Sequence, residues 1–283
     1  MWDGSHVKRG SIVSDRQQQP TSTAHGNEAL DLSGRRVLIT GGAGDMGVAV
    51  VRRLSDQGAV VVVNDVAEDP VARDRLRGCV ESRTPYVPAD VRDAAEVDRL
   101  LHDGERAAGG PFDLVCCHAG IVDSHPVQEF PMESFDAIQA LNVRGSYLVA
   151  SAVSRRWRAL GRPGSLVFTS SWVQDVPWPG IAPYAASKAA VRSLMRSFAR
   201  ELAPYGIRSN AVAPGIVGVG MAKRQWDSEP GYRSRAEKAI PLGVLQTPES
   251  VADAFLFLAS PLSAYMTGAT LLVDGGCSLY PMD

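Results

Sequence analysis

The strongest constraint on the fold of this chain is a repeated alternation between short apolar runs and longer amphipathic stretches, which starts near Arg36. Near-continuous runs of valine, isoleucine and leucine predict strands that are buried on both faces. Parallel strands need crossovers of a dozen or more residues, and the amphipathic stretches supply these as helices. We expect strands at residues 36–40, 60–64, 86–90, 113–117, 165–170, 207–213 and 270–276. The pattern predicts an α/β fold in a single domain, around a doubly wound, seven-stranded parallel sheet.

Composition excludes several classes of protein. The chain has 283 residues, 45% of them hydrophobic, and a formal net charge of −2. Without an excess of basic residues it predicts no nucleic-acid partner. No apolar run approaches the ~20 residues that cross a bilayer and no signal-peptide pattern is present, so we expect no membrane partner and a cytoplasmic protein. The four cysteines show no CxxC spacing and are expected to be reduced.

The most informative short segment is the glycine turn "GGAGDMG" at 41–47, which follows the first expected strand and opens an amphipathic helix. Gly42, Gly44 and Gly47 satisfy the spacing GxGxxG. In this position, exposed backbone N–H groups and the positive end of the helix dipole bind the diphosphate of a dinucleotide. A purely structural glycine turn is the alternative reading. The turn therefore predicts a Rossmann fold with a dinucleotide site.

An acidic residue after the second expected strand indicates which dinucleotide binds. Asp65 follows Gly47 at close to the spacing of about 20 residues at which a carboxylate reaches the adenosine ribose. Because a carboxylate accepts hydrogen bonds from a ribose diol and repels a 2′-phosphate, NAD is favoured over NADP. The alternative is that Asp65 only forms a turn.

The chain resembles the short-chain dehydrogenase/reductase family, in its ordinary, non-extended branch, from Leu32 to Leu279. The resemblance rests on the glycine turn and on further segments in the family's order, which are "DVRD" (90–93), "CHAG" (117–120), "LNVRG" (141–145), "SS" (170–171), "YAASK" (184–188), "APG" (213–215) and "VDGG" (273–276). It implies a dinucleotide-binding and catalytic domain over residues 34–283. The polar, aperiodic residues 1–33 are expected to form a flexible tail.

Four positions depart from the family pattern. Asp45 stands where the ordinary branch has glycine, and we expect its carboxylate to cap the first turn of the helix. Cys117 and His118 replace two asparagines, and Val219 replaces a threonine expected beside the nicotinamide. The resemblance implies the following cofactor-binding residues: Gly41, Gly44, Asp45, Met46, Gly47, Asp65, Val66, Asp90, Val91, His118, Ala119, Gly120, Tyr184, Lys188, Pro214, Gly215 and Val217.

The chemistry is expected at Tyr184 and Lys188, which lie four residues apart and so share one helix face. A tyrosine that removes a proton near neutral pH needs its pKa lowered from about 10 to about 7, or about 4 kcal/mol of preference for the phenolate. A lysine ammonium about 4 Å away at an effective dielectric near 20 supplies about that much. The pair therefore predicts an acid–base tyrosine assisted by lysine.

The resemblance implies two more catalytic residues. Ser171 would hold the substrate oxygen, with Ser170 as the competing assignment, and Asn142 would help a water chain connect Lys188 to solvent. The reaction expected is hydride transfer between the nicotinamide and a secondary alcohol or ketone. No metal is expected, because the histidines form no HExxH pattern and the chemistry needs no Lewis acid.

Substrate recognition is expected in the segment between Ser171 and Tyr184 and in a lid at about 216–242. Trp172, Gln174 and Trp178, together with Ser171 and Tyr184, are the candidate substrate residues. Aromatic and polar side chains there favour a sugar, polyol or sugar acid, although the aromatic residues could equally be packing residues. A net charge of +2 in the lid suits an anionic group or a solvated helix.

The alternatives are a 3-oxoacyl or hydroxysteroid reductase and, from another class, a non-catalytic dinucleotide-binding regulator. The family commonly assembles as tetramers, so the resemblance implies a homotetramer or homodimer.

Overall fold

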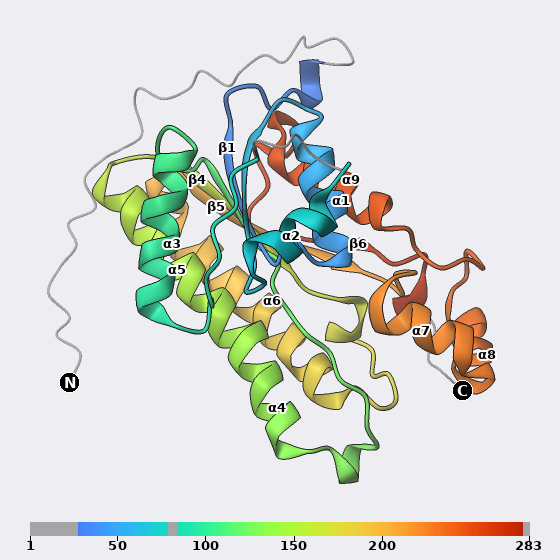
Figure 1. The fold of residues 1–283 in the computed structure, drawn as a ribbon. Helices are drawn as coiled ribbons and strands as arrows, with labels where there is room; N and C mark the ends of the chain where they lie inside the picture. Colours follow the sequence, from blue (N-terminus) through green and yellow to red (C-terminus); the bar gives the residue numbers. More distant parts are fainter. Residues whose placement is uncertain (1–27, 79–83, 280–283) are drawn as a thin grey trace, which may run out of the picture.

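The computed structural model describes residues 28–78 and 84–279. Within these ranges six parallel strands form one sheet in the order β2-β1-β3-β4-β5-β6 (Figure 1). The strands are β1 (Arg36–Thr40), β2 (Val60–Asn64), β3 (Leu114–Cys117), β4 (Gly164–Thr169), β5 (Ile207–Pro214) and β6 (Thr270–Val273). The chain runs from β1 outward to β2 and then returns to the other side of β1 with β3. This reversal creates the crevice at which doubly wound sheets bind their ligands.

The doubly wound parallel sheet is confirmed, with one strand fewer than expected. The segment predicted as a strand at 86–90 makes a single parallel bridge, between Tyr86 and Val63. Backbone hydrogen bonds still join this segment to the end of β2, from the N–H of Val87 to Val63 at 2.9 Å and from the N–H of Ala89 to Asp65 at 3.1 Å. The side-chain amide of Asn64 also donates to the carbonyl oxygens of Val87 and Ala89, both at 3.1 Å. The segment therefore runs alongside β2 where a seventh strand was expected.

Helices cover both faces of the sheet. The helices are α1 (Asp45–Ser55), α2 (Asp69–Leu76), α3 (Ala94–Ala107), α4 (Met132–Ile138), α5 (Ser146–Ala159), α6 (Ala182–Leu202), α7 (Gly220–Ser228), α8 (Pro230–Ala239) and α9 (Pro248–Ala259). A π-helical segment at Gln139–Gly145 joins α4 to α5. Short 3-10 turns lie at Glu28–Leu30, Val127–Glu129, Trp172–Gln174, Ala203–Tyr205, Pro261–Ser263 and Cys277–Leu279. None of the helices in the described ranges has the length and apolar character that a membrane crossing requires.

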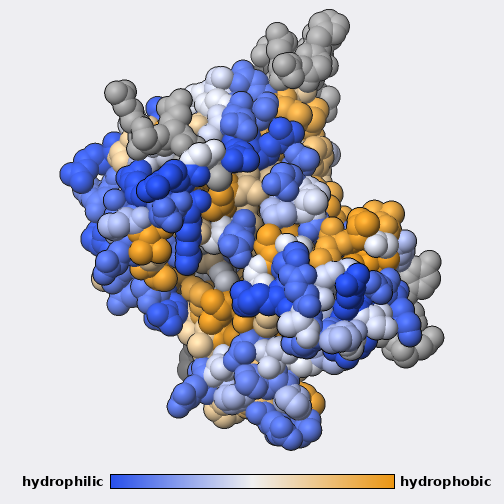
Figure 2. All heavy atoms as spheres, turned by 45° about the vertical axis from the view of Figure 1, so that its right-hand side comes forward, coloured by the Kyte–Doolittle hydropathy of each residue, from blue (hydrophilic) through white to orange (hydrophobic). Residues whose placement is uncertain are grey.

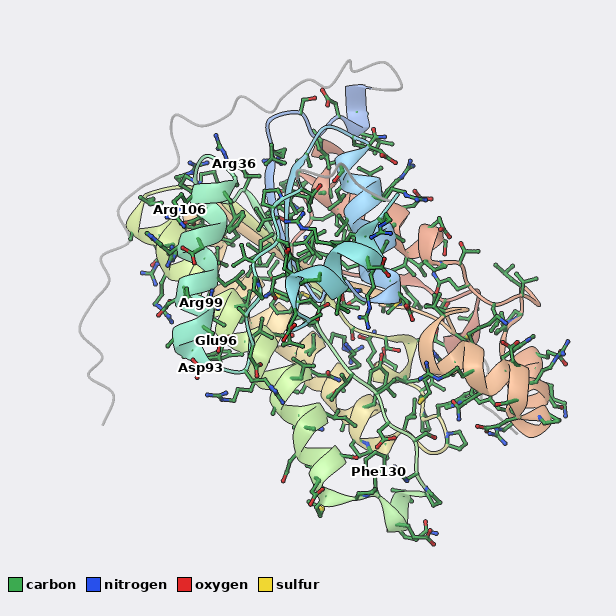
Figure 3. The ribbon with its side chains drawn as sticks, viewed as in Figure 1. Arg36, Asp93, Glu96, Arg99, Arg106 and Phe130 are labelled. Carbon is green, nitrogen blue, oxygen red and sulfur yellow. The ribbon has the colours of Figure 1, made fainter. Side chains whose placement is uncertain are left out.

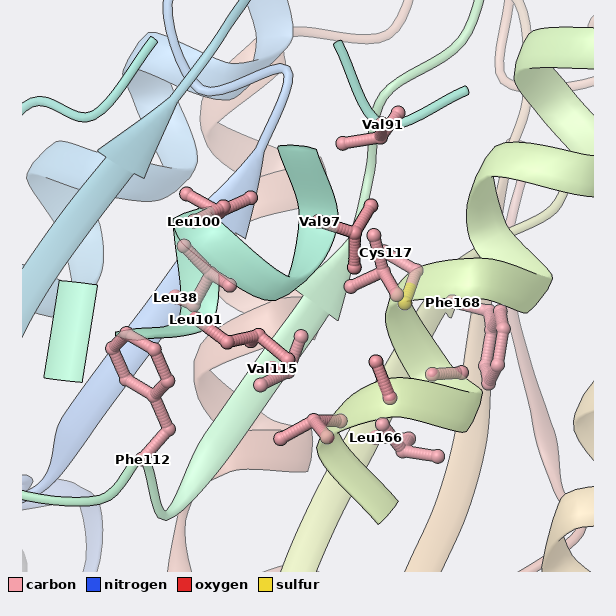
Figure 4. Packing of buried hydrophobic residues seen from close by; sticks show 14 of the residues in the cluster. Leu38, Val91, Val97, Leu100, Leu101, Phe112, Val115, Cys117, Leu166 and Phe168 are labelled. Carbon is pink, nitrogen blue, oxygen red and sulfur yellow. The ribbon is translucent and has the colours of Figure 1, made fainter. Parts of the chain in front are cut away.

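The strands are apolar on both faces because each face has its own core. Leu38 and Val115 point toward α3, α5 and α6, where Leu100, Leu101 and Phe168 pack with them (Figure 4). The alternate residues of the same strands pack against α1 and α9 on the opposite face. Side chains of successive strand residues point to opposite faces, so this division follows from strand geometry.

Local signals in the sequence fix several element ends. Asp93 caps α3, because its carboxylate accepts hydrogen bonds from the backbone N–H groups of Ala95 at 2.7 Å and Glu96 at 3.0 Å (Figure 3). Thr247 caps α9 in the same way, through Ser250.

The structure describes only the end of the expected tail, but it describes the whole of the expected lid. Residues 1–27 lie outside the described residues, so the tail proposed for 1–33 is described only at its end. There Leu32 is buried in the core beside α1. The region proposed as a lid contains α7 and α8, which form a lobe beside the sheet (Figure 1).

Candidate active site

A cavity of about 830 Å³ lies at the carboxyl ends of the strands. The residues that directly follow five of the strands line it, namely Gly41, Asp65, His118, Ser170 and Gly215. Figure 2 shows a hollow with hydrophobic side chains beside it on the face that carries α7 and α8. The cavity occupies the crevice that the strand order predicts.

The glycine turn has no room for side chains at three positions. A Cβ on Gly41, whose φ is +68°, would lie 2.7 Å from the Cα of Ala119. On Gly42 it would lie 2.8 Å from Val63, and on Gly47 it would collide with the carbonyl oxygen of Gly41. The turn after β1 therefore packs directly on the turn after β3. This close packing leaves backbone groups, at the N-terminus of α1, facing the space where a dinucleotide diphosphate fits.

Asp45 does not cap α1 as expected. The N-cap is Gly44, which offers no side-chain acceptor, and Asp45 is the first residue of the helix. Its exposed carboxylate lies on the cavity wall, 3.5 Å from the position that a Cβ on Gly220 would occupy. The prediction was wrong because a residue inside the first turn cannot reach back to the N–H groups that an N-cap side chain serves.

Asp65 lies at the opposite end of the cavity from α8. Its carboxylate accepts hydrogen bonds from the backbone N–H of Ala43 at 3.2 Å and of Val66 at 2.8 Å. Tyr86 donates to the carbonyl oxygen of Asp65 at 3.3 Å and so braces the loop. Arg75 of α2 lines the same end, and no motif in the sequence identified it. This end therefore presents one fixed carboxylate and one guanidinium.

Asp90 is not on the cavity wall, although its neighbours Ala89 and Val91 are. Arg92 binds the Asp90 carboxylate through two nitrogens, at 2.9 and 2.7 Å, and this hydrogen bonding lowers the pKa of Asp90. The side chain is thus committed to an ion pair that the motif "DVRD" does not reveal.

Tyr184 and Lys188 lie one turn apart on α6, and both line the cavity. Burial lowers the pKa of Lys188 to about 8, and its ammonium donates to the carbonyl oxygen of Thr169 at 2.9 Å. The ammonium nitrogen is 5.4 Å from the centre of the Tyr184 ring.

The expected acidity of Tyr184 is absent from this arrangement. Burial raises its pKa to about 12, and a hydrogen bond with the Ser171 side chain offsets only part of that rise. The simple Coulomb argument overstated the effect of Lys188, since it left out the cost of burying a phenolate. Lys188 alone therefore does not make Tyr184 a base near neutral pH.

Asn142 lies in the π-helical segment between α4 and α5 and is fully buried. Its side-chain oxygen accepts from the N–H of Ile121 at 2.9 Å, and its amide donates to the carbonyl oxygen of Ile121 and to Ser187, both at 3.0 Å. A Cβ on Gly120 would lie 3.1 Å from the Asn142 oxygen and 3.4 Å from the Lys188 nitrogen. Asn142 thus lies behind the wall, close to Lys188, and the helix widens where it enters.

The side chains of Ser170 and Ser171 have different hydrogen-bond partners. The Ser170 hydroxyl lies within hydrogen-bond distance of two acceptors, the side-chain oxygen of Gln174 at 2.7 Å and the carbonyl oxygen of Lys188 at 3.0 Å. Ser171 faces Tyr184 and has the extended backbone that precedes a 3-10 turn. Gln174 does not line the described cavity, because its oxygen is already bound to Ser170. The geometry therefore favours Ser171 over Ser170 as the free hydroxyl and excludes Gln174 from the wall.

His118 occupies one of the positions where the sequence departs from its family. Its Nδ1 lies 2.9 Å from the Thr169 hydroxyl, and its ring packs edge-on against Phe255. Burial, with a smaller contribution from Lys188, lowers its pKa to about 4. A neutral imidazole therefore stands where an asparagine was expected.

The aromatic residues of the substrate segments pack mainly on one another. Trp172 and Trp178 have ring centres 5.4 Å apart, and Trp178 and Tyr232 have centres 5.9 Å apart, both edge to face. These three residues line the cavity and are nonetheless largely buried. They join the loop after Ser171 to α8.

The remaining predicted cofactor residues lie either on the cavity wall or behind it. Of the predicted cofactor residues that line the cavity, the ones not yet placed there are Gly44, Met46, Val66, Ala119, Gly120, Pro214 and Val217. Gly47 is buried behind the wall. Several wall residues carry no motif and were not among the predicted site residues, namely Ser124, His125, Gln225, Glu229 and Arg235, of which the last three lie in the proposed lid. Across residues 28–78 and 84–279, no group of His, Cys, Asp and Glu side chains is arranged to hold a metal.

A sheet that reverses its strand order at a glycine turn, with a tyrosine and a lysine one turn apart beside the same crevice, defines a class of enzyme. The class is that of oxidoreductases that use a nicotinamide dinucleotide and act on CH–OH groups. A family model described as "Enoyl-(Acyl carrier protein) reductase" matches residues 41–278. The chain belongs to the short-chain dehydrogenase/reductase family.

Individual relatives agree over nearly their whole length. The chain is 35% identical to a glucose 1-dehydrogenase from Gluconobacter oxydans, over 88% of this chain and 93% of the relative. It is 35% identical to 3beta-hydroxysteroid dehydrogenase 1 from Eggerthella lenta, over 89% and 96%. The crystal structure of a gluconate 5-dehydrogenase from Burkholderia cenocepacia, in complex with NADP and tartrate, is similar with a TM-score of 0.82 and 32% identity, over 90% of this chain and 100% of that one.

Proposed function

We propose that the protein is an NAD-dependent dehydrogenase of a polyhydroxylated secondary alcohol, that is, a sugar, a polyol or a sugar acid. The observation that carries the proposal is the meeting of Ser171, Tyr184 and Lys188 on one cavity wall, at the carboxyl ends of the strands. Polar side chains at the α8 end of the cavity and the names of a glucose and a gluconate dehydrogenase among the relatives support a polyhydroxylated substrate.

In this proposal, each catalytic residue has one task. Ser171 holds the substrate oxygen, and Tyr184 gives a proton to that oxygen during reduction or takes it during oxidation. Lys188 stabilises the phenolate when it forms, and Asn142 holds the backbone of Ile121 beside Lys188. When bound, the nicotinamide exchanges a hydride with the carbinol carbon.

The cofactor preference rests on Asp65. Its carboxylate is fixed by two backbone N–H groups at the rim of the cavity, where it can accept the ribose hydroxyls of NAD. A 2′-phosphate at the same place would meet a negative charge. Arg75 stands at the same end and favours the phosphate, so the two cofactors are to be compared directly.

The remaining cofactor residues are proposed by their position on the wall. The diphosphate would lie over Gly41, Gly44 and Met46. The nicotinamide half would lie along the wall made by Ala119, Gly120, Tyr184, Lys188, Pro214, Gly215 and Val217, and the adenine end beside Val66 and Val91.

A hydroxysteroid or 3-oxoacyl reductase is the second candidate. Apolar side chains such as Val122, Met221 and Tyr232 line the cavity next to the catalytic residues, and a hydroxysteroid dehydrogenase is among the relatives. A panel of sugars, sugar acids and polyols, run beside steroids and acyl substrates with NAD and with NADP, separates the two. Turnover of steroids alone would refute the proposal.

The Tyr184→Phe variant tests whether the protein is a catalyst. We expect turnover to fall by at least about a hundredfold, since a general acid–base group contributes roughly 10²–10⁴-fold. Binding of NAD, measured by quenching of tryptophan fluorescence, should change little. A variant with unchanged turnover would contradict the assigned role, and a wild-type protein that binds NAD but oxidises nothing would favour a regulator.

We also propose that the protein assembles as a homodimer or homotetramer. Two exposed apolar areas support this. One surrounds Tyr147 on α5, whose ring lies 6.0 Å from that of Phe198 on α6, and the other surrounds Leu272 on the edge strand β6.

A further inference from the structure

The lid helices α7 and α8 carry several charged residues, and most of them are accounted for by their own helix. Lys223 pairs with Asp227 at 2.5 Å, and Arg233 pairs with Glu237 at 3.0 Å. Arg235 has no carboxylate within 4 Å among the described residues, and it lines the cavity. Arg224 also has no such partner there, but it lies off the cavity wall.

Arg235 belongs to the substrate end of the cavity. It follows Tyr232 by three residues on α8, and Tyr232 packs against Trp178, which packs against Trp172, the residue after Ser171. Two ring-to-ring steps thus separate the catalytic serine from the helix turn that carries Arg235. Of the other cationic side chains on the wall, Arg75 lies near Asp65, and Lys188 donates to Thr169.

Glu229 is the opposing charge on the same wall. It precedes α8, and both it and Arg235 are close enough to the Tyr232 hydroxyl to influence it. Burial raises the pKa of Tyr232 to about 12, Arg235 acts to lower it, and Glu229 acts to raise it. Arg235 and Glu229 form no ion pair in the described structure, so the guanidinium is available to a carboxylate of a ligand.

A second polar group stands at this end. His125 lines the cavity, its Nε2 lies 3.0 Å from the Asp123 carboxylate, and Ser134 holds that carboxylate at 2.7 Å. A carboxylate can only accept, so His125 Nε2 carries a proton and donates it to Asp123. The loop is tied to the Trp178 segment by the hydrogen bond from the His125 N–H to the carbonyl oxygen of Gly180 at 2.9 Å.

We propose that Arg235 is the specificity residue for the carboxylate of the substrate, and that the substrate is a polyhydroxylated acid whose carboxylate lies several carbons from the reacting carbinol. The guanidinium presents a fork of donors that matches a carboxylate, and it is permanently charged. The separation follows from the two ring contacts, with centres 5.4 and 5.9 Å apart, that lie between Trp172 beside Ser171 and Tyr232 on α8. This inference rests on the proposed function, since it takes the reacting carbinol to be at Ser171 and Tyr184.

The test compares acids with uncharged alcohols of the same skeleton. We measure kcat/KM for hexonates and pentonates, and for the matching alditols, in the wild type and in Arg235→Gln, Glu229→Gln and Arg224→Gln. For the acids we expect Arg235→Gln to lower kcat/KM roughly 10- to 100-fold, mainly through KM, as loss of a hydrogen bond to a charged group predicts. Glu229→Gln should raise it by about threefold, because it removes a like charge. Arg224→Gln, a change of the same type away from the cavity, should leave it within about twofold.

The results with acids and with uncharged compounds distinguish a failure of this inference from a failure of the proposed function. Wild-type enzyme that turns over alditols or neutral sugars as well as it does acids would overturn the inference and leave the dehydrogenase intact. Equal losses for acids and alditols in both Arg235→Gln and Glu229→Gln would also overturn it, since a neutral ligand would use both side chains for hydroxyl groups. Silence of every polyhydroxylated compound would overturn the proposed function as well. All variants change exposed side chains, and unaltered thermal unfolding confirms that each is folded.

Discussion

At the scale of single residues, burial changes the pKa of both Lys188 and Tyr184. It favours the neutral form of each, placing the pKa of Lys188 at about 8 and that of Tyr184 at about 12. Near pH 7 the lysine is therefore charged while the tyrosine keeps its proton. The resting site is prepared to donate a proton, as reduction of a ketone requires.

This ordering predicts opposite pH dependences for the two directions. For reduction, we expect kcat/KM to be flat from about pH 6 to 7.5 and to fall above about pH 8 as Lys188 loses its charge. For oxidation, kcat/KM should rise with pH toward about pH 8 and level off above it, since Lys188 loses there the charge that stabilises the phenolate. Initial rates in each direction at constant ionic strength provide the measurement. A reduction rate that increases between pH 8 and 9 would contradict the assignment.

His118 provides a prediction about stability. Its folded pKa of about 4 lies below the ordinary value of 6.5, so the unfolded chain binds its proton first as the pH falls. Stability is therefore lost on acidification from about pH 6.5 toward 4, by up to about 3 kcal/mol from this group. His118→Asn should flatten that part of the curve of unfolding free energy against pH, measured by urea denaturation. The matched change of the exposed His102 on α3 should leave the slope as in the wild type.

At the scale of the elements, the glycines of the turn between β1 and α1 have two different roles. Gly47 allows close packing inside the protein, whereas Gly44 lines the cavity. A Cβ on Gly47 would collide with the Gly41 carbonyl oxygen, whereas a Cβ on Gly44 would have the same oxygen as its nearest neighbour, at 3.3 Å. We expect Gly47→Ala to lower the unfolding free energy by about 1–3 kcal/mol, as overpacking does. Gly44→Ala should keep most of the stability and weaken NAD binding, because Gly44 lines the cavity. Thermal unfolding and NAD titration of both variants check this, and equal effects of the two changes would contradict it.

The helices and strands also show which features of the fold can be predicted from the sequence. Strand and helix positions followed from periodicity, because that pattern reflects burial on one or two faces of a single element. The irregular segment that follows the Tyr86 bridge did not, since the Asn64 side chain binds it at Val87 and Ala89, which only the folded arrangement brings close. Nor did the π-helical turn around Asn142, whose amide is satisfied by Ile121 and Ser187.

The site was predictable to the extent that it is local. Tyr184, Lys188 and the glycine turn are recognisable within a few residues of sequence. His125 and Arg235 are brought to the cavity by a loop and a helix far apart in the chain, and neither belongs to a recognisable motif. The acidity of Tyr184 was overestimated because burial, which opposes it, depends on the whole fold.

At the scale of the whole molecule, the proposed assembly rests on exposed apolar side chains at two separate places on the surface. Tyr147 on α5 is 47% exposed, and Leu272 on the edge strand β6 is 44% exposed. An edge strand presents unpaired backbone groups that another strand can bind. One self-complementary surface gives a dimer, and two distinct ones give a tetramer with three two-fold axes.

We therefore expect that the subunit contact at each place can be lost without loss of the other. If both are interfaces, Tyr147→Glu alone and Leu272→Glu alone should each reduce a tetramer to a dimer, because each places a charge within one apolar contact and leaves the other unchanged. The double variant should be a monomer. Sedimentation velocity at micromolar concentration measures the mass of each, with Leu160→Glu, an exposed change at the other end of α5, as the control. A wild-type protein that sediments as a monomer would refute the assembly, and a single variant that dissociates fully would show that one surface depends on the other.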